Sequence, residues 1–403
     1  MDRLGKDFSL SALVAGLIAV IISYAGPLII VFQAAHQAQL SNEVTASWIW
    51  AISIGSGLTG MLLSWKLRVP VITAWSTPGA ALLVSMLPSV SLAQAVGAYI
   101  VASLLIAVIA LSGAFDKLMS RLPKAIAAAM LAGILFRFGA ELFNSISLQP
   151  VLVLTMLATY LLFKRLSPRY AILAVLIVGG GLASSLGHLD SQALVLEMAT
   201  PVWTTPQWNW SAIINIGLPL ALVSLTGQSV PGIAVLRTSG YQTPARPIVS
   251  VTAIGSLLLA PFACHGVNLA AITAAICTGR EAHENADKRY IAGIACGAFY
   301  LLMGTFGATL ASVFAALPRE MIAALAGLAL FGAIATGLTG AMADEKQREP
   351  ALITFLVTAS GMSFLGLGAA FWGLIFGLLA HFALSYTRAR PAQSEHVSLG
   401  EQR

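Results

Sequence analysis

The sequence predicts an all-α polytopic membrane protein with 14 transmembrane spans, built as a 7+7 inverted repeat in which two spans combine a short strand with a half-helix. Three observations lead to this prediction. Long segments carry no charge, the basic residues gather in regularly spaced clusters, and one apolar motif recurs about half a chain later. A water-soluble protein, in which about a quarter of the residues are charged, is excluded.

Charge-free segments define the membrane-embedded part. Only 9% of the 403 residues are charged and 58% are hydrophobic. A helix of roughly 20 apolar residues crosses a hydrocarbon core about 30 Å thick, so each segment is long enough for one or two crossings. The runs are continuously apolar, whereas barrel strands alternate, so a β-barrel is excluded. The segments without Asp, Glu, Lys or Arg are 8–42, 69–115, 198–236, 247–279 and 350–387.

The same composition excludes several functional classes. In a membrane protein the net charge of +6 reports topology, so no nucleic-acid partner is expected. Cys264, Cys277 and Cys296 lie in or beside apolar segments and are expected to be small buried residues, not disulfides or metal ligands. The sequence has no nucleotide-binding motif, no metal-ligand spacing and no nucleophile–base pair. We therefore expect neither an enzyme nor an ATP-driven pump, and no metal or cofactor.

The basic residues predict the topology. Between successive clusters lies an apolar segment with a turn-like middle, and the positive-inside rule places every cluster in the cytoplasm. Each of the seven segments must then leave and return, which gives 14 spans with both termini cytoplasmic. Twenty of the 22 Lys and Arg residues fall in these eight clusters: Arg3/Lys6, Lys66/Arg68, Lys117/Arg121/Lys124, Lys164/Arg165/Arg169, Arg237/Arg246, Arg280/Lys288/Arg289, Lys346/Arg348 and Arg388/Arg390/Arg403.

A repeated motif predicts that the two halves have opposite orientations. Residues 122–136 (LPKAIAAAMLAGILF) resemble residues 317–331 (LPREMIAALAGLALF), at an offset of 194 or 195. Lys124 belongs to a cytoplasmic cluster, whereas Arg319 lies in the middle of a hairpin and is expected outside. Seven spans per half give this inversion, which is common among secondary transporters with a substrate site near the midplane. A generic Leu-Pro helix start is the alternative explanation.

Two spans are predicted to be interrupted. Residues 70–86 (PVITAWSTPGAALLVSM) read as an extended stretch to about Thr77 and then a half-helix, because Ser or Thr before Pro is a helix start. Residues 261–278 (PFACHGVNLAAITAAICT) have the same layout. Only 33 residues separate Arg246 from Arg280, fewer than the roughly 40 of two helical crossings. Two half-helix N-termini meeting in the bilayer would favour an anion; ordinary kinked spans are the alternative.

At these residues the sequence resembles the benzoate:proton symporter (BenE) family. The matching stretches are 73–81 (TAWSTPGAA), 268–277 (NLAAITAAIC) and 370–374 (AFWGL), and the resemblance extends over the chain up to the polar tail. The family is similar in architecture to uracil/xanthine permeases and to sulfate and bicarbonate transporters. The resemblance implies a protein of the bacterial inner membrane that moves a small aromatic carboxylate together with protons.

The resemblance also implies a division into domains. It predicts a core domain in 9–113 (spans 1–4) and 212–312 (spans 8–11), and a gate domain in 122–187 (spans 5–7) and 317–387 (spans 12–14). Residues 388–403 would form a polar cytoplasmic tail. Elevator-like movement of the core and homodimers through the gate are further expectations.

Candidate site residues surround the two interruptions. Nucleobase permeases carry acidic residues on spans 8 and 10, where this chain has Gln228 and His265, which argues against uracil or xanthine. Gln228 lies in a Gly-Gln-Ser stretch before Pro231, where we expect a further break in the helix. His265 can change charge near neutral pH and is the candidate for proton coupling. Tyr24 and Trp75 could stack on an aromatic substrate or pack in the core. The expected substrate-binding residues are Tyr24, Trp75, Ser76, Thr77, Gln228, His265, Gly266 and Asn268.

The predicted function is proton-coupled symport of benzoate or a similar carboxylate into the cell. A carrier of another small anion or of a nucleobase-like substrate, or an uncoupled anion facilitator, is the alternative. Arg137 and Glu141 are charged residues inside a predicted span; they are four apart and are expected to pair, either structurally or at the gate.

Overall fold

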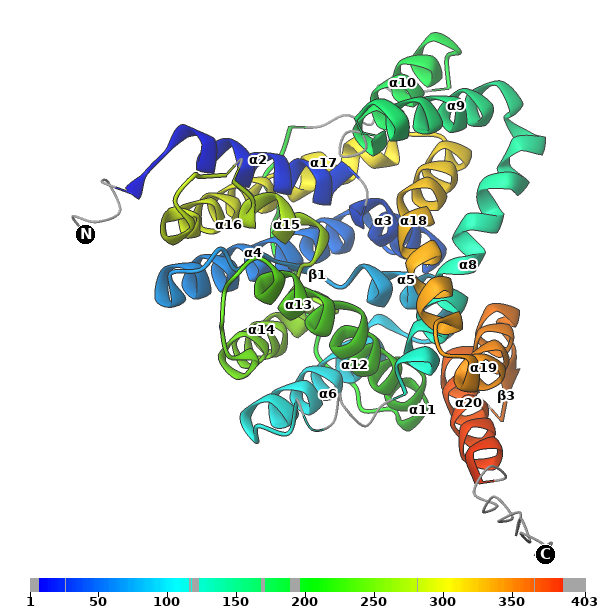
Figure 1. Cartoon of the computed structure of the whole chain (residues 1–403). Helices are drawn as coiled ribbons and strands as arrows, with labels where there is room; N and C mark the ends of the chain where they lie inside the picture. Colours follow the sequence, from blue (N-terminus) through cyan, green and yellow to red (C-terminus); the bar gives the residue numbers. More distant parts are fainter. Residues whose placement is uncertain are drawn as a thin grey trace, which may run out of the picture.

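The computed structural model is almost entirely helical (Figure 1). It describes residues 7–25, 27–115, 117, 123–167, 171–188, 196–280, 282–365 and 367–386. The predicted polar tail at 388–403 lies outside the described residues. Within them, seven helices are long and apolar enough to cross a membrane, or eight if the pair Ala286–Thr305 and Gly307–Phe314, bent by 68°, is one broken span. The prediction of a polytopic helical membrane protein is therefore confirmed.

The first half of the chain consists of helices and one short strand, β1, which precedes the short helix α5. Ser41 and Ser91 cap two of the long helices, and the Ser91 cap is a capping box with Gln94. The elements are α2 Leu10–Ala25, α3 Pro27–Gln37, α4 Asn42–Leu67, β1 Thr73–Trp75, α5 Thr77–Met86, α6 Leu92–Leu111, α8 Lys124–Leu148, α9 Pro150–Leu166 and α10 Ala171–Ser185.

The second half is also mostly helical, with a strand between two of its helices and a more irregular start. Its elements are α11 Trp210–Ala212, η4 Ile213–Gly217, α12 Leu218–Ser224, η5 Leu225–Ser229, α13 Val230–Thr238, α14 Ala245–Leu259, η6 Ala260–Phe262, β2 Val267–Leu269, α15 Ile272–Thr278, α16 Tyr290–Thr305, α17 Gly307–Ala315, α18 Arg319–Met342, α19 Arg348–Ser360, β3 Ser363–Phe364, β4 Leu367–Gly368 and α20 Ala369–Tyr386.

The helix from α11 to α13 runs without a break, which corrects one expectation. The sequence predicted an interruption around Gln228, but η4 and η5 are π-helical turns within a continuous helix. Each π-turn ends two residues before a proline, Pro219 or Pro231. Proline cannot donate a backbone hydrogen bond, and widening the preceding turn accommodates this, as in the Val230 N–H bond to Leu225 O.

The last residues of three helices in the first half lie 194 positions before the last residues of three helices in the second half, the same offset as in the repeated motif. The last residues of α6 and α16 are Leu111 and Thr305, 194 positions apart. Those of α8 and α18, Leu148 and Met342, have the same separation. So do those of α9 and α19, Leu166 and Ser360. The spacing therefore applies to secondary structure along the chain, beyond the motif itself.

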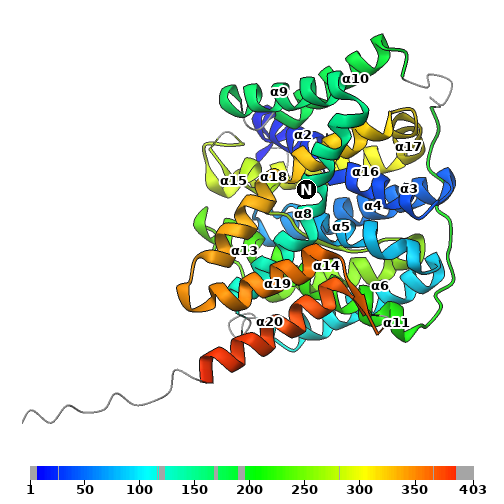
Figure 2. The same cartoon turned by 90° about the vertical axis from the view of Figure 1, so that its right-hand side faces the viewer.

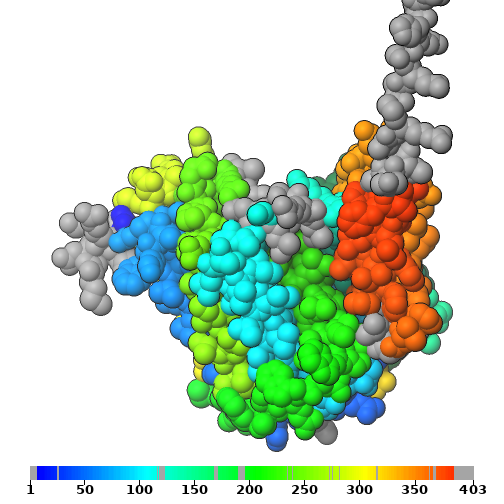
Figure 3. Space-filling model, turned by 90° about the horizontal axis from the view of Figure 1, so that it is seen from below, coloured from blue at the N-terminus to red at the C-terminus, as the bar shows by residue number. Residues whose placement is uncertain are grey.

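The helices of the first half pack against helices of the second half. Helix α4 packs on α16 and α6 packs on α14, while α8 packs on α18 and α19 (Figures 1 and 2). The α4–α16 contact is close because Gly57 and Gly297 face each other; a Cβ on Gly57 would lie 2.8 Å from the Gly297 oxygen. From below, the orange-red helices α19 and α20 form one flank beside the cyan and green surface of α6 and α11–α14 (Figure 3).

The expected Arg137–Glu141 pair is not formed. Arg137 donates from Nη2 to the Ser360 oxygen at 3.1 Å, at the end of α19. Glu141 instead accepts from Asn144 Nδ2 at 3.1 Å. The free carbonyls at a helix C-terminus carry a partial negative charge, so a guanidinium from the neighbouring helix is a favourable partner. Arg137 thus joins α8 to α19.

Candidate substrate-binding site

A two-stranded antiparallel ladder lies at the centre of the candidate site. Strand β1 pairs with β2, and Ala74 lies opposite Asn268, 194 positions later. The ladder is extended at both ends by two further backbone bonds, from Ser76 N to Gly266 O at 3.1 Å and from Ala270 N to Ile72 O at 2.8 Å. The two donors, Ser76 and Ala270, are 194 positions apart, and so are the two acceptors, Ile72 and Gly266. The two interrupted segments predicted from sequence therefore meet and are related by a local two-fold arrangement.

Serines from neighbouring helices satisfy the extended backbone beside the ladder. Ser64 on α4 donates to Val71 O at 3.0 Å and accepts from Val71 N at 3.1 Å. Ser256 on α14 does the same for Val267, at 3.2 Å and 2.7 Å. Non-helical backbone at membrane depth is tolerated only when protein or a wet cavity satisfies its polar groups. Each of these two hydroxyls therefore satisfies one N–H and one C=O group of the non-helical backbone.

Each strand leads into a short helix that points away from the ladder. Helix α5 starts at Thr77, with Ser76 as its N-cap: the Ser76 Oγ accepts from Gly79 N at 3.0 Å. Pro78 occupies the first turn, where a missing N–H costs least. Helix α15 starts at Ile272. Because the strands are antiparallel, the two helices begin on opposite sides of the ladder with their N-termini toward it.

His265 connects the ladder to two other elements and is buried, with 1% of its surface exposed. Its Nδ1 accepts the indole N–H of Trp48 on α4 at 3.0 Å. Its Nε2 lies 3.0 Å from the Ser76 carbonyl oxygen. An indole N–H can only donate, so Nδ1 must offer its lone pair and Nε2 must carry the hydrogen. The ring is thus neutral and both of its nitrogens are engaged.

Gly266 and Asn268 follow His265 in the same interrupted segment. Asn268 is buried, and its side-chain Nδ2 has no hydrogen-bond acceptor among the described residues. Gly266 has a φ of 143°, a conformation that side-chain-bearing residues rarely adopt. Side chains alternate along a strand, so Asn268 and its partner Ala74 lie on the opposite face of the ladder from Trp75. A buried free donor on that face suits an anion.

Tyr24 and Trp75 pack together on the other face. Their ring centroids are 5.4 Å apart, and Tyr300 lies 5.9 Å from each of them. The Tyr24 hydroxyl forms a hydrogen bond with Ser53 Oγ at 2.5 Å. The structure thus shows both rings in a core aromatic cluster, which is one of the two roles expected for them.

Gln228 lies in the π-turn η5, which contacts strand β2. A Cβ on the adjacent Gly227 would lie 3.7 Å from Pro78 of α5 and 3.7 Å from Leu131 of α8. The π-turn, the start of α5 and helix α8 therefore converge at this point. The structure brings Ser76, Thr77, His265, Gly266 and Asn268 together around the ladder, with Gln228 on the neighbouring turn.

The profile of the BenE family, described as benzoate membrane transport protein, matches residues 6–383. The chain belongs to this family. A BenE protein described as a benzoate membrane transport protein of Acinetobacter baylyi is 51% identical, over 96% of this chain and 99% of the relative. The inner membrane protein YdcO of Escherichia coli is 41% identical, over 93% of this chain and 95% of the relative. The resemblance seen in the sequence is confirmed, and this BenE protein is a membrane transporter and not an enzyme.

Solved structures show the same fold at low sequence identity. The structure of SLC26A9 has a TM-score of 0.66 at 12% identity, and covers 96% of the BenE chain and 67% of its own. The transmembrane domain of the cyanobacterial bicarbonate transporter BicA has a TM-score of 0.59 at 13% identity, with 94% and 97% covered. The predicted similarity in architecture to bicarbonate transporters is thus confirmed at the level of the fold, whereas the similarity to uracil/xanthine permeases stays a prediction.

Three residues around the ladder were not predicted from the sequence. Trp48 and Ser64 lie in the apolar part of α4 and Ser256 lies in the apolar part of α14, and none of them belongs to a motif. Their partners are seven or more positions away, and Trp48 is 217 positions from His265. The only available signal was a polar or indole group inside an apolar span, which is too common to single out a residue.

Proposed function

We propose that this protein transports benzoate, or a similar small aromatic carboxylate, into the cell across the bacterial inner membrane together with a proton. Family membership and a relative described as a benzoate transporter support the substrate. The observation that carries the proposal is the β1–β2 ladder, which holds the start of α5 beside a buried free amide donor. Partial positive charge at a helix start stabilises a carboxylate.

The carboxylate would bind between Asn268 and the start of α5. Asn268 Nδ2 supplies one donor, and the Thr77 backbone N–H at the first turn supplies a second. Gln228, on the π-turn that contacts β2, would be a third polar contact. The aromatic ring would lie against apolar groups near Leu131 and Pro78. Tyr24 and Trp75 would form the wall behind the ladder.

The architecture that we propose for this function is the 14-span inverted repeat. It is supported by the 194-residue spacing of helix ends and by the ladder pair with that same spacing. The spans beyond the seven or eight long ones would be short: α9, α10 and α19 have 17, 15 and 13 residues. With the basic clusters inside, both termini would be cytoplasmic.

The core and gate domains would move against each other. The proposed core holds α2–α6 and α11–α17, and the proposed gate holds α8–α10 and α18–α20. The proposed site lies where η5 and α5 of the core meet α8 of the gate. An elevator movement would carry the ladder and its ligand past the gate helices, and the gate would also supply the interface of a homodimer.

His265 would couple transport to protons. Its Nδ1 lone pair is occupied by the Trp48 N–H, so a proton can bind there only when Trp48 moves away. Proton binding is therefore tied to a change in the contact between α4 and the ladder. The resulting imidazolium, next to Ser76, would offset the charge of the bound carboxylate.

The test is uptake of radiolabelled benzoate by proteoliposomes with and without an imposed inward proton gradient. The proposal expects accumulation only with the gradient, and competition by salicylate but not by uracil. The second candidate is a carrier of another anion, favoured by the fold of SLC26A9 and BicA. Uptake of bicarbonate or sulfate without benzoate uptake would support it, and benzoate uptake that only equilibrates would indicate an uncoupled facilitator.

A further inference from the structure

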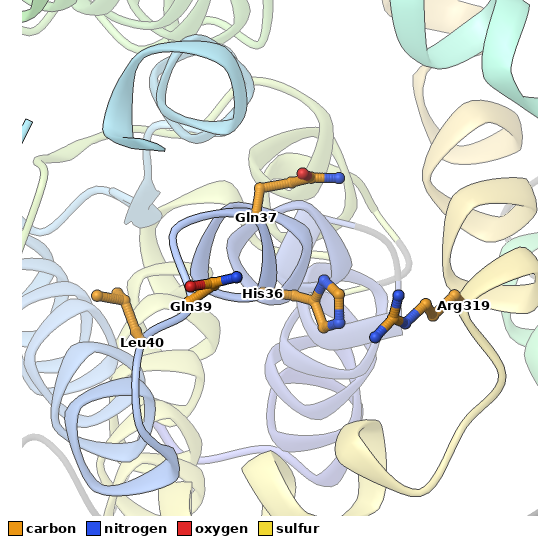
Figure 4. Close-up of a pocket in the computed structure, with 5 residues that line it drawn as sticks. All are labelled: His36, Gln37, Gln39, Leu40 and Arg319. Atoms are coloured by element: carbon orange, nitrogen blue, oxygen red, sulfur yellow. The ribbon is translucent and has the colours of Figure 1, made fainter. Parts of the chain in front are cut away.

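A cavity of about 410 Å³ lies away from the ladder, at the junction of α3 and α18. It is lined by four residues at the end of α3 and in the turn that follows, and by the first residue of α18: His36, Gln37, Gln39, Leu40 and Arg319. The His36 ring and the Arg319 guanidinium point toward each other across it (Figure 4). In the proposed architecture one wall belongs to the core and the other to the gate.

Arg319 has no evident structural task. Within the part of the chain that the structure describes, no carboxylate lies within 4.0 Å of it and no hydrogen bond involves its side chain. Arg319 and Arg137 are the two basic residues outside the eight clusters. Arg137 binds the end of α19, whereas Arg319 faces the cavity. A basic residue on the side predicted to be outside runs against the usual charge distribution and needs a reason.

The lining groups suit an anion with a carboxylate head. The guanidinium presents two parallel donors that match a carboxylate. His36 and the amides of Gln37 and Gln39 add further donors around the same space. Among the lining residues none is acidic. The cavity volume is large enough for a small aromatic acid, since ligand pockets usually measure roughly 300–1,000 Å³.

The cavity is also connected to the ladder through one helix. Helix α3 carries His36 and Gln37 at one end and packs along α5, the half-helix of the proposed site. One turn deeper on α3, the Gln33 Oε1 is buried without a hydrogen-bond partner among the described residues. Polar groups therefore continue along α3 below the cavity.

We propose that this cavity is an outer capture site, in which Arg319 and His36 bind the carboxylate of the substrate before it reaches the ladder. The inference rests on the proposed benzoate transport and adds a second, peripheral binding site to it. Because its two walls belong to different domains, a ligand bound there would hold core and gate together at this face until it moved inward.

Uptake kinetics in proteoliposomes test this proposal. Arg319→Gln is expected to raise the KM for benzoate about tenfold, since a charge-assisted hydrogen bond is lost. Arg319→Lys keeps the positive charge but not the two parallel N–H donors of the guanidinium, so it should raise the KM by less. Glu43→Gln, near the same face but outside the cavity, is the control and should leave KM unchanged. An unchanged KM for Arg319→Gln, with benzoate uptake by the wild type, would overturn the capture site.

A second measurement does not depend on transport. Maleimide labelling of the Gln39→Cys variant in membranes should be slowed by millimolar benzoate, because Gln39 lines the cavity. The native cysteines are buried and give a low background. Protection should persist with Asn268→Ala and disappear with Arg319→Gln. Labelling that benzoate leaves unchanged would reject the site even if transport is confirmed, and absent benzoate uptake by the wild type would instead reject the proposed function.

Discussion

The His265 ring lies between the indole of Trp48 and the carbonyl oxygen of Ser76, with 3.0 Å on each side. The Ser76 oxygen also accepts the first hydrogen bond of α5, from Ala80 N at 2.8 Å. The imidazole, which precedes strand β2, therefore connects this segment to helix α4 and to the start of helix α5. A change at this ring reaches the proposed site directly.

Two substitutions of His265 distinguish its role in proton coupling from its role as a hydrogen-bond donor to Ser76. His265→Gln can still donate to the Ser76 oxygen but cannot titrate, so we expect downhill benzoate uptake without alkalinisation of the medium. His265→Ala should abolish proton-coupled uptake. Initial uptake rates and external pH, recorded together, measure both effects. Normal alkalinisation in the two variants would show that the proton is carried elsewhere.

Trp48→Phe keeps an aromatic ring but removes the donor to His265 Nδ1. The unpaired buried acceptor should lower the free energy of unfolding by about 1–3 kcal/mol. With the lone pair no longer occupied, a proton binds more easily, so the pH profile of uptake should move toward higher pH. Thermal melting and uptake between pH 5 and about 8 measure the two consequences. Trp50→Phe, two positions further along the same helix, is the matched control.

Gly266→Ala tests the backbone conformation of the interruption. At a φ of 143° a side chain is strained, and such strain costs about 1–3 kcal/mol. We expect a lower melting temperature and weaker benzoate binding, because the Ser76–Gly266 bond would be distorted. Gly332→Ala, at a helical position with nothing within 4 Å, is the control and should be neutral or slightly stabilising. Equal melting temperatures for the two variants would contradict the argument.

Arg289 holds the end of the other half-helix. It is 8% exposed and donates to Thr278 O at 2.7 Å and His283 O at 2.7 Å. Arg289→Gln removes these charge-assisted hydrogen bonds and should lower the free energy of unfolding by about 2 kcal/mol, since hydrogen bonds to charged groups contribute roughly 1.5–3 kcal/mol. Arg280→Gln, an exposed neighbour, is the control for loss of charge. Thermal melting of both variants is the measurement.

Asp7 makes stability depend on pH at the membrane surface. The Tyr290 hydroxyl donates to it at 2.9 Å and, with Lys288 at 3.5 Å, holds its pKa below the ordinary value of 3.8. A depressed carboxyl pKa stabilises the fold above the unfolded-state pKa, and this is lost as pH falls through the folded-state value. Asp7→Asn should therefore melt earlier than wild type at pH 7, with the difference vanishing below pH 3.8. A constant difference would contradict this.

Much of the site could be predicted because its signals are local. The extended stretch before Pro78 and the polar break at His265-Gly266 are visible in the sequence, and the structure places them side by side. The expected break at Gln228 was wrong because a proline can be accommodated by a π-turn as well as by a break. The Arg137–Glu141 pair was wrong because spacing along a helix permits a contact but a helix end offered a better partner.

By itself the sequence determined a polytopic membrane protein, the positions of its two interruptions and the 194-residue spacing, because hydropathy, charge and helix-start residues act over a few neighbouring positions. Only the tertiary structure decided that Trp48 restrains His265 and that Arg319 faces His36. Those partners are far apart along the chain and are brought together by helix packing, which depends on the shape of the whole molecule and not on any local pattern.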